Sequence, residues 1–95
     1  MEGQEHEEAL SVFESLKDGY GSLIGYMVYS IQQQKLGEND VAKIEHYGKE
    51  IFRLERLRQS VDWHQVEQNK LALEEVSPKV KEAFELVKKG LAAQV

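Results

Sequence analysis

Histidine offers the first candidates for chemistry, because the chain has three histidines and no cysteine. A di-iron helical bundle needs Glu-x-x-His motifs, but the residues three positions before the histidines are Gly3, Lys43 and Val61. His46 and Glu50, one helical turn apart, could share a metal ion, yet no second pair of ligands accompanies them. No serine stands in a nucleophile motif, and no glycine-rich phosphate loop is present. The sequence therefore predicts neither a metal nor another cofactor.

A second chemical possibility lies in the run His46, Tyr47, Gly48, Lys49. On a helix, Lys49 lies one turn from His46, where its charge can stabilise a phosphorylated imidazole while Gly48 leaves access. In its His-x-x-Lys spacing the run resembles histidine phosphotransfer domains, which are helical bundles of about this size. The resemblance implies a phosphoryl relay through His46. Glu50 follows where that family usually has glycine, and its carboxylate repels a phosphoryl group, so phosphotransfer is the alternative function.

A basic stripe is formed by Lys49, Arg53 and Arg56, which recur at helical spacing. Such a stripe can hold phosphate groups, so nucleic-acid binding is a second alternative. However, residues 35–60 carry six cations and five acids, and the whole chain has a net charge of -5. Glutamates one turn away can pair with the basic side chains. These glutamates are Glu45, Glu50 and Glu55. The sequence thus favours a solvated, self-paired face with little affinity for nucleic acid.

Aromatic side chains are the best candidates for a contact with another protein. Tyrosine and tryptophan combine an apolar ring with a polar tip, and interfaces are enriched in them. We expect the partner-binding residues to be Tyr26, Tyr29, Tyr47 and Trp63, with Lys49, Arg53 and Arg56 as a polar rim. This choice rests on their chemistry and helical spacing.

The elements that position these residues are predicted to be helices. In the first segment the apolar series steps by four and three residues and comprises Ala9, Phe13, Leu16, Tyr20, Leu23 and Met27. This period predicts a helix from about Glu7 to Lys35. A hinge near Asp18 and Gly19 is the alternative, but the series keeps its phase across the glycines. The small-xxx-small pair Gly21 and Gly25, with Gly48 on the next segment, predicts a close helix crossing.

Two more helical segments follow a turn at residues 36–40, where Gly37 can end a helix and Asn39 or Asp40 can cap the next. The second segment extends from Val41 to Val61, and its continuation beyond residue 60 stays open. Asp62 and Gln65 have capping-box spacing and mark a weaker break. Ser77 and Pro78 predict the start of the last helix, with apolar residues from Val80 to Leu91 and a cap at Gly90.

At 95 residues the chain has room for one domain, residues 1–95, in which residues 1–6 are expected to form a frayed acidic arm. The predicted fold class is all-α, an antiparallel helical hairpin plus a C-terminal helix, with three to four helices. Two long amphipathic helices and a short one make a thin monomer. We therefore expect a helical bundle completed by dimerisation, which makes a homodimer the first expected partner.

Composition narrows the class of protein further. Without cysteine the chain cannot form a disulfide scaffold, a thiol enzyme or a zinc–thiolate site. The acidic N-terminus does not resemble a signal peptide, and the longest uncharged run, residues 19–34, is shorter than the ~20 residues that span a bilayer. The sequence predicts a cytoplasmic, non-enzymatic interaction protein, namely an adaptor, an inhibitor or a regulator.

Overall fold

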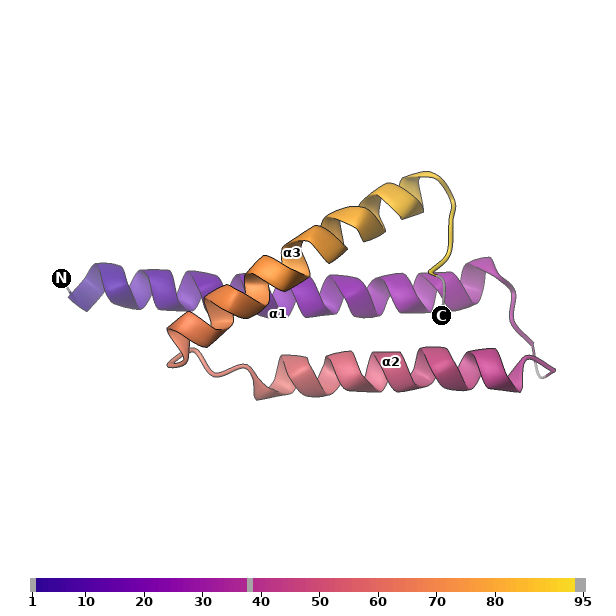
Figure 1. Ribbon diagram of the computed structural model, residues 1–95, viewed down its shortest axis with the longest axis horizontal. Coiled ribbons are helices and arrows are strands. Elements are labelled where there is room, and N and C mark those ends of the chain that lie inside the picture. The colour runs from indigo at the N-terminus through magenta and orange to yellow at the C-terminus, as the bar shows by residue number, and fades with distance from the viewer. Residues whose placement is uncertain (1, 38, 94–95) are drawn as a thin grey trace.

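Three helices form the described part of the chain in the computed structural model (Figure 1). The structure describes residues 2–37 and 39–93, with side chains from His6 onward. The helices are α1 (Glu2–Gln33), α2 (Val41–Ser60) and α3 (Val66–Lys88). The prediction of an all-α protein is confirmed, and the expected three to four helices are three.

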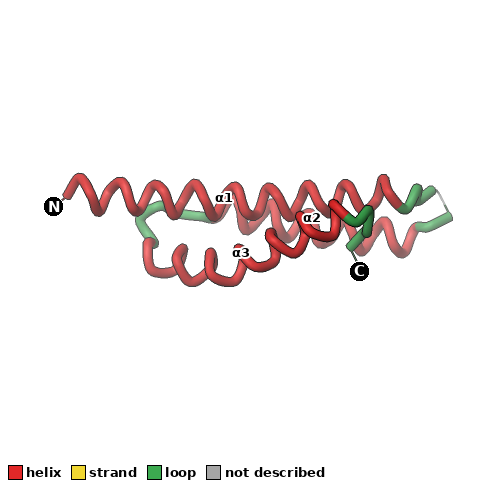
Figure 2. The backbone as a smooth tube through the Cα atoms, turned by 90° about the horizontal axis from the view of Figure 1, so that it is seen from above, coloured by secondary structure: helices red, strands yellow, loops and turns green. Residues whose placement is uncertain are grey.

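The longest helix, α1, carries the packing of both others. α2 runs antiparallel to α1, and α3 crosses α1 obliquely (Figures 1 and 2). Within the described residues α2 and α3 each contact α1 but do not contact each other. The molecule measures 57 × 25 × 15 Å, so it is long and thin.

A continuous α1 confirms that the apolar period extends through the glycines without a hinge. Four of its side chains, Leu16, Tyr20, Leu23 and Tyr26, are buried at steps of four, three and three residues. They join Leu54 of α2 and a short buried stretch of α3 in one core. Each helical glycine costs about 1 kcal/mol relative to alanine. Burial of the apolar stripe offsets this cost, as it does for most helices in proteins.

The connection between α1 and α2 differs in detail from the prediction. The left-handed residue at the end of α1 is Lys35, with φ 51°, rather than Gly37. The N–H of Leu36 donates to the carbonyl of Ile31 at 3.4 Å, which closes a Schellman-type cap. Asp40 precedes α2 as predicted, but its carboxylate accepts the N–H of Gly37 at 3.1 Å instead of an N–H of α2.

The predicted helix start at Ser77 and Pro78 is wrong, because Pro78 lies inside α3. Proline in a helix interior costs about 3 kcal/mol. Here Val76 is buried against α1 and Val80 packs on the same core, so apolar contacts continue on both sides of the proline. The break falls instead at residues 61–65, where the capping-box spacing predicted only a weaker break.

Asp62 organises this break, although not as a helix cap. Its carboxylate accepts the backbone N–H of His64 at 3.0 Å and lies 2.7 Å from the Nδ1 of His64. These two bonds lower the pKa of Asp62. Its carbonyl accepts the side-chain amide of buried Asn69 at 2.9 Å. Gln65 takes the N-cap position without a side-chain bond, so the predicted capping box does not form.

The predicted glycine crossing is also wrong in its residues. An added Cβ would find nothing within 4 Å at Gly25 or Gly48, and at Gly21 it would meet the guanidinium carbon of Arg58 at 3.7 Å. The close approach lies at Gly19, where a Cβ would stand 2.7 Å from the Cγ1 of Val76. α1 and α3 therefore cross at Gly19, which the small-xxx-small pattern does not include.

Candidate functional site

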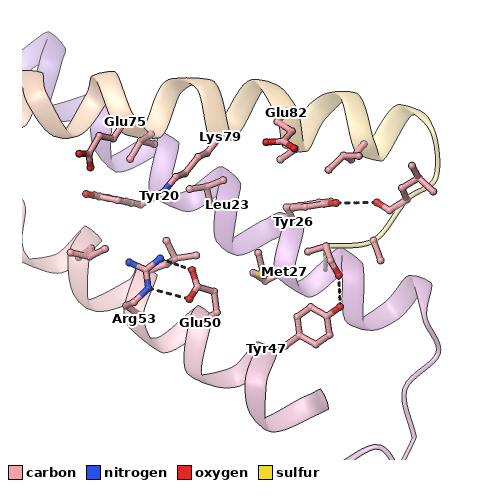
Figure 3. Close-up of a pocket in the computed structure, with 18 of the residues that line it drawn as sticks. Tyr20, Leu23, Tyr26, Met27, Tyr47, Glu50, Arg53, Glu75, Lys79 and Glu82 are labelled. Carbon is pink, nitrogen blue, oxygen red and sulfur yellow. Dashed lines mark hydrogen bonds and ion pairs between the residues drawn. The ribbon is translucent and has the colours of Figure 1, made fainter. Parts of the chain in front are cut away.

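A groove of about 870 Å³ lies between α2 and α3, and α1 forms its floor (Figure 3). Leu23 and Met27 of α1 line the floor, Leu54 and Leu57 of α2 line one wall, and Val76, Ala83 and Leu86 of α3 line the other. The groove exists because α2 and α3 both pack on α1 while staying apart from each other. It is therefore a channel built on core positions of all three helices, with apolar side chains on its floor and polar side chains along both walls.

Charged side chains line both walls in the middle part of the groove, which we call the waist. They are Glu50, Arg53, Glu75, Lys79 and Glu82. On α2 the guanidinium of Arg53 donates to Glu50, with Nε 3.1 Å from a carboxylate oxygen. On α3 the groove is lined by Glu75, Lys79 and Glu82 (Figure 3). Each wall thus carries both signs of charge above an apolar floor.

The pKa shifts show how these charges face one another. The hydrogen bond from Arg53 lowers the pKa of Glu50 against the opposing effect of burial, and Lys79 from the opposite wall lowers it further. Burial raises the pKa of Tyr20, which lies in the field of both Arg53 and Glu75. Glu50 on α2 therefore lies in the field of Lys79 on α3, so at this point the two walls present opposite charges to each other.

One end of the groove is closed by residues 90–93, the segment that follows α3. The Tyr26 hydroxyl donates to the carbonyl of Leu91 at 3.1 Å, and the Tyr47 hydroxyl donates to the carbonyl of Ala93 at 2.7 Å (Figure 3). Gln34 donates in turn to the Tyr47 hydroxyl. Two tyrosines from different helices thus fix the segment across the groove end.

Three of the seven predicted partner-binding residues meet at this groove: Tyr26, Tyr47 and Arg53. Tyr26 and Tyr47 are almost fully buried, with 7% and 2% of their surface exposed. Their hydroxyls are engaged by the chain itself, so they serve as the groove lining more than as an exposed contact surface. Whether the seven residues bind a partner stays a prediction.

The other four predicted residues lie elsewhere. Tyr29 stacks on Tyr26 with ring centroids 6.2 Å apart and faces a second hollow between α1 and α3. Trp63 lies at the far end of the molecule, its ring centroid 3.8 Å from that of His64. Lys49 and Arg56 are exposed on α2, and Arg56 lies over the ring of Phe52 at 5.8 Å.

The candidate phosphotransfer residue, His46, is exposed on α2. Gly48 has open space around its Cα, as a phosphoryl site requires. Lys49 pairs with Glu45 at 3.5 Å, one turn before it, and Glu50 is engaged by Arg53. The relay through His46 stays a prediction, and the bond to Arg53 occupies the carboxylate that could have shared a metal with His46.

Several residues of the groove were not singled out by the sequence. Glu75, Lys79 and Glu82 recur at helical spacing beside the buried residues Val76 and Ala83, and this spacing could have pointed to a charged edge next to the core. Ser30 is fully buried and binds the segment after α3. Nothing local marks Ser30, because its partner Ala93 is 63 positions away in the chain.

Within the described residues, no group of three or more His, Asp or Glu side chains could hold a metal ion. In the same part of the chain, no helix has the length and apolar character that crossing a membrane requires. Comparisons of the chain with protein-family models, curated proteins and solved structures found no match.

Proposed function

We propose that this chain is a non-enzymatic interaction protein that binds an amphipathic helix of a partner protein in the groove between α2 and α3. The observation that carries the proposal is the groove itself, a channel of about 870 Å³ with an apolar floor on α1 and charged side chains on both walls. Helical bundles commonly complete such a core with a fourth helix, and peptide helices bind proteins in grooves of this kind.

The chemistry of the partner helix follows from the waist. Glu50 and Arg53 on one wall, and Glu75 and Lys79 on the other, are desolvated further when a helix enters. Such charges need opposite charges in return. Glu50 and Arg53 already pair with each other, so the partner helix is expected to carry an apolar stripe for Leu23 and Met27 and, on the α3 side, one acidic and one basic residue.

A charge reversal tests the proposal. Lys79→Glu places a second carboxylate opposite Glu50, whereas Lys81→Glu makes the same change on the same helix at an exposed position that does not line the groove. Immobilised wild-type chain and the Lys81→Glu variant are expected to retain a common protein that the Lys79→Glu variant loses. Its affinity is expected to fall about tenfold or more in the Lys79→Glu variant, a typical cost for a truncated or reversed charge pair.

The same experiment can contradict the proposal. If no retained protein distinguishes the Lys79→Glu variant from the other two chains, the groove is not the docking surface. A second readout is the methyl resonance of Met27 on the groove floor. A bound partner that leaves this resonance in place binds elsewhere.

We also propose that the chain self-associates as a homodimer, with the groove left open. What supports this is the second hollow, about 240 Å³ between α1 and α3, which is lined by apolar side chains and by Gly25. Phe84 beside it is 58% exposed. Light scattering on a sizing column at two distant concentrations is expected to give twice the mass of the chain. Phe84→Glu is expected to return it to monomer, and a monomeric wild type overturns the dimer.

A further inference from the structure

The segment that follows α3 is held by side chains of the other two helices. α3 ends in a Schellman cap, in which the N–H of Gly90 donates to the carbonyl of Val87 and the N–H of Leu91 to that of Leu86, both at 2.9 Å. Gly90 is left-handed, with φ 71°, and reverses the chain. Figure 1 shows the segment leaving the end of α3 and running back to α1.

Four side chains bind this segment, and every bond goes to its backbone. Gln33 donates to the carbonyl of Gly90 at 3.3 Å, and Tyr26 and Tyr47 donate to the carbonyls of Leu91 and Ala93. The Ser30 hydroxyl accepts the N–H of Ala93 at 2.8 Å and donates to the carbonyl of Tyr26 at 2.8 Å. Three donors and one acceptor thus match three carbonyls and one N–H of the peptide backbone. The four binding residues are Tyr26, Ser30, Gln33 and Tyr47.

Burial shows that this is a formed site and not a chance surface contact. Ser30 has none of its surface exposed, Tyr47 has 2% and Tyr26 has 7%. Buried hydroxyls that lose their partners cost free energy, so the site needs an occupant that supplies the same backbone groups. Within the described residues, no buried side-chain polar atom lacks a hydrogen-bond partner, so the segment satisfies these hydroxyls.

The site selects a bound peptide by its backbone hydrogen-bonding groups and by the size of its side chains. Leu91 is half exposed, and Ala92 and Ala93 are partly buried against the groove end. Recognition through main-chain hydrogen bonds gives affinity with little dependence on sequence. An irregular peptide with small apolar side chains therefore meets the requirements of the site.

We propose that Tyr26, Ser30, Gln33 and Tyr47 form a binding site for a non-helical peptide backbone, and that residues 90–93 of the same chain occupy it as an exchangeable ligand. A partner segment of the same chemistry displaces them. This proposal depends on the proposed function in one respect. The displacing segment is taken to be the stretch of the partner protein next to the helix that binds in the groove. The tethered segment competes at an effective concentration in the millimolar range, so a free peptide binds well only when the tether is weakened.

The first test reads the native segment directly. The Ala93 amide is expected to exchange its hydrogen about tenfold faster in Ser30→Ala than in the wild type, because its acceptor is lost. Ser11→Ala makes the same change at an exposed position of α1 and is expected to leave the rate unchanged. Equal Ala93 rates in all three chains show that the segment is not held and overturn the proposal.

The second test supplies the ligand in trans. Ala93→Pro in the full chain removes the N–H that Ser30 accepts, one of the four bonds to the segment, and so weakens the binding of the native segment. The probe is a synthetic peptide with the sequence of residues 88–95, and a matched peptide carries proline in place of Ala93. The native peptide is expected to shift the Ser30 and Tyr47 resonances of the Ala93→Pro chain. The wild type is expected to need about tenfold more peptide, because its own segment competes.

The outcomes separate this proposal from the groove proposal. If the native peptide shifts neither chain, or both chains equally, or if the proline peptide acts like the native one, the site is not an exchangeable peptide site. None of these readouts needs a helical partner. If the groove experiment fails, the results of the peptide experiment still hold. If the peptide experiment fails, the binding experiment with Lys79→Glu still tests the groove.

Discussion

At the residue scale, the end of α1 contains a correctable conformational strain. Lys35 adopts a left-handed conformation with φ 51°, which costs an L-residue about 1 kcal/mol or more. We expect Lys35→Gly to raise the free energy of unfolding by about 1 kcal/mol, because glycine adopts this conformation freely. Urea denaturation measures the change.

The matched control for Lys35→Gly is Lys43→Gly. Lys43 is an exposed lysine within the first turn of α2. There the same substitution is expected to lower stability, by up to about 1 kcal/mol, because glycine is a poor helix former. Two variants that shift stability in the same direction would show that Lys35 is not strained.

Buried phenols make the chain sensitive to alkaline pH. Burial raises the pKa of Tyr20 above its ordinary value of 10.0, with Arg53 opposing and Glu75 adding to the shift. A group whose pKa is raised in the folded state contributes stability below its unfolded pKa and loses it as the pH rises through the folded pKa. We expect the urea concentration at the denaturation midpoint to decrease as the pH rises above about 10. In Tyr20→Phe this decrease is expected to be smaller. An equal fall in Tyr20→Phe contradicts the assignment.

At the element scale, the crossing of α1 and α3 depends on one glycine. A Cβ at Gly19 would stand 2.7 Å from Val76, whose branched side chain is buried and cannot turn away. We expect Gly19→Ala to lower stability by up to about 2 kcal/mol, since overpacking costs more than the gain in helix propensity. Thermal or urea denaturation measures this.

Gly25→Ala is the control for the crossing. Gly25 lies in the same helix, and an added Cβ there meets nothing within 4 Å. This substitution is expected to raise stability by about 1 kcal/mol through helix propensity. If both alanines stabilise the chain, α3 does not cross α1 at Gly19.

Helix periodicity was sufficient to predict the elements but not their ends. The apolar series of the first segment predicted α1 through three glycines, because an amphipathic stripe in contact with a core outweighs local propensity. Local signals failed at Ser77 and Pro78, where packing of Val76 and Val80 on α1 keeps the helix intact. A cap or a breaker acts over a few residues, whereas burial acts across the whole helix.

The candidate site was predicted in part for the same reason. Tyrosine chemistry pointed to Tyr26 and Tyr47, and both line the groove. Their hydroxyls donate to the backbone carbonyls of residues 91 and 93, which the chain reversal at Gly90 brings near. Contacts between positions 46 to 65 apart depend on the tertiary fold, and no pattern within one helix contains them.

At the scale of the whole molecule, the open arrangement predicts that α2 and α3 open independently. Both pack on α1 and do not contact each other within the described residues. Local opening of one helix then leaves the contacts between the other helix and α1 in place. In a closed three-helix bundle each helix supports both neighbours, and all amides share one opening reaction.

Native-state hydrogen exchange of two core variants tests this independence. Leu54 of α2 is buried, with 2% of its surface exposed. Leu54→Ala is expected to lower the free energy of opening of the α2 amides by about 2–4 kcal/mol. Val76→Ala is expected to weaken α3 amides by about 2 kcal/mol. Each variant should leave the amides of the other outer helix that exchange by local opening nearly as they are in the wild type. Equal losses in α2 and α3 for both variants would show one cooperative unit, and the two walls of the groove would then not move separately when a partner enters.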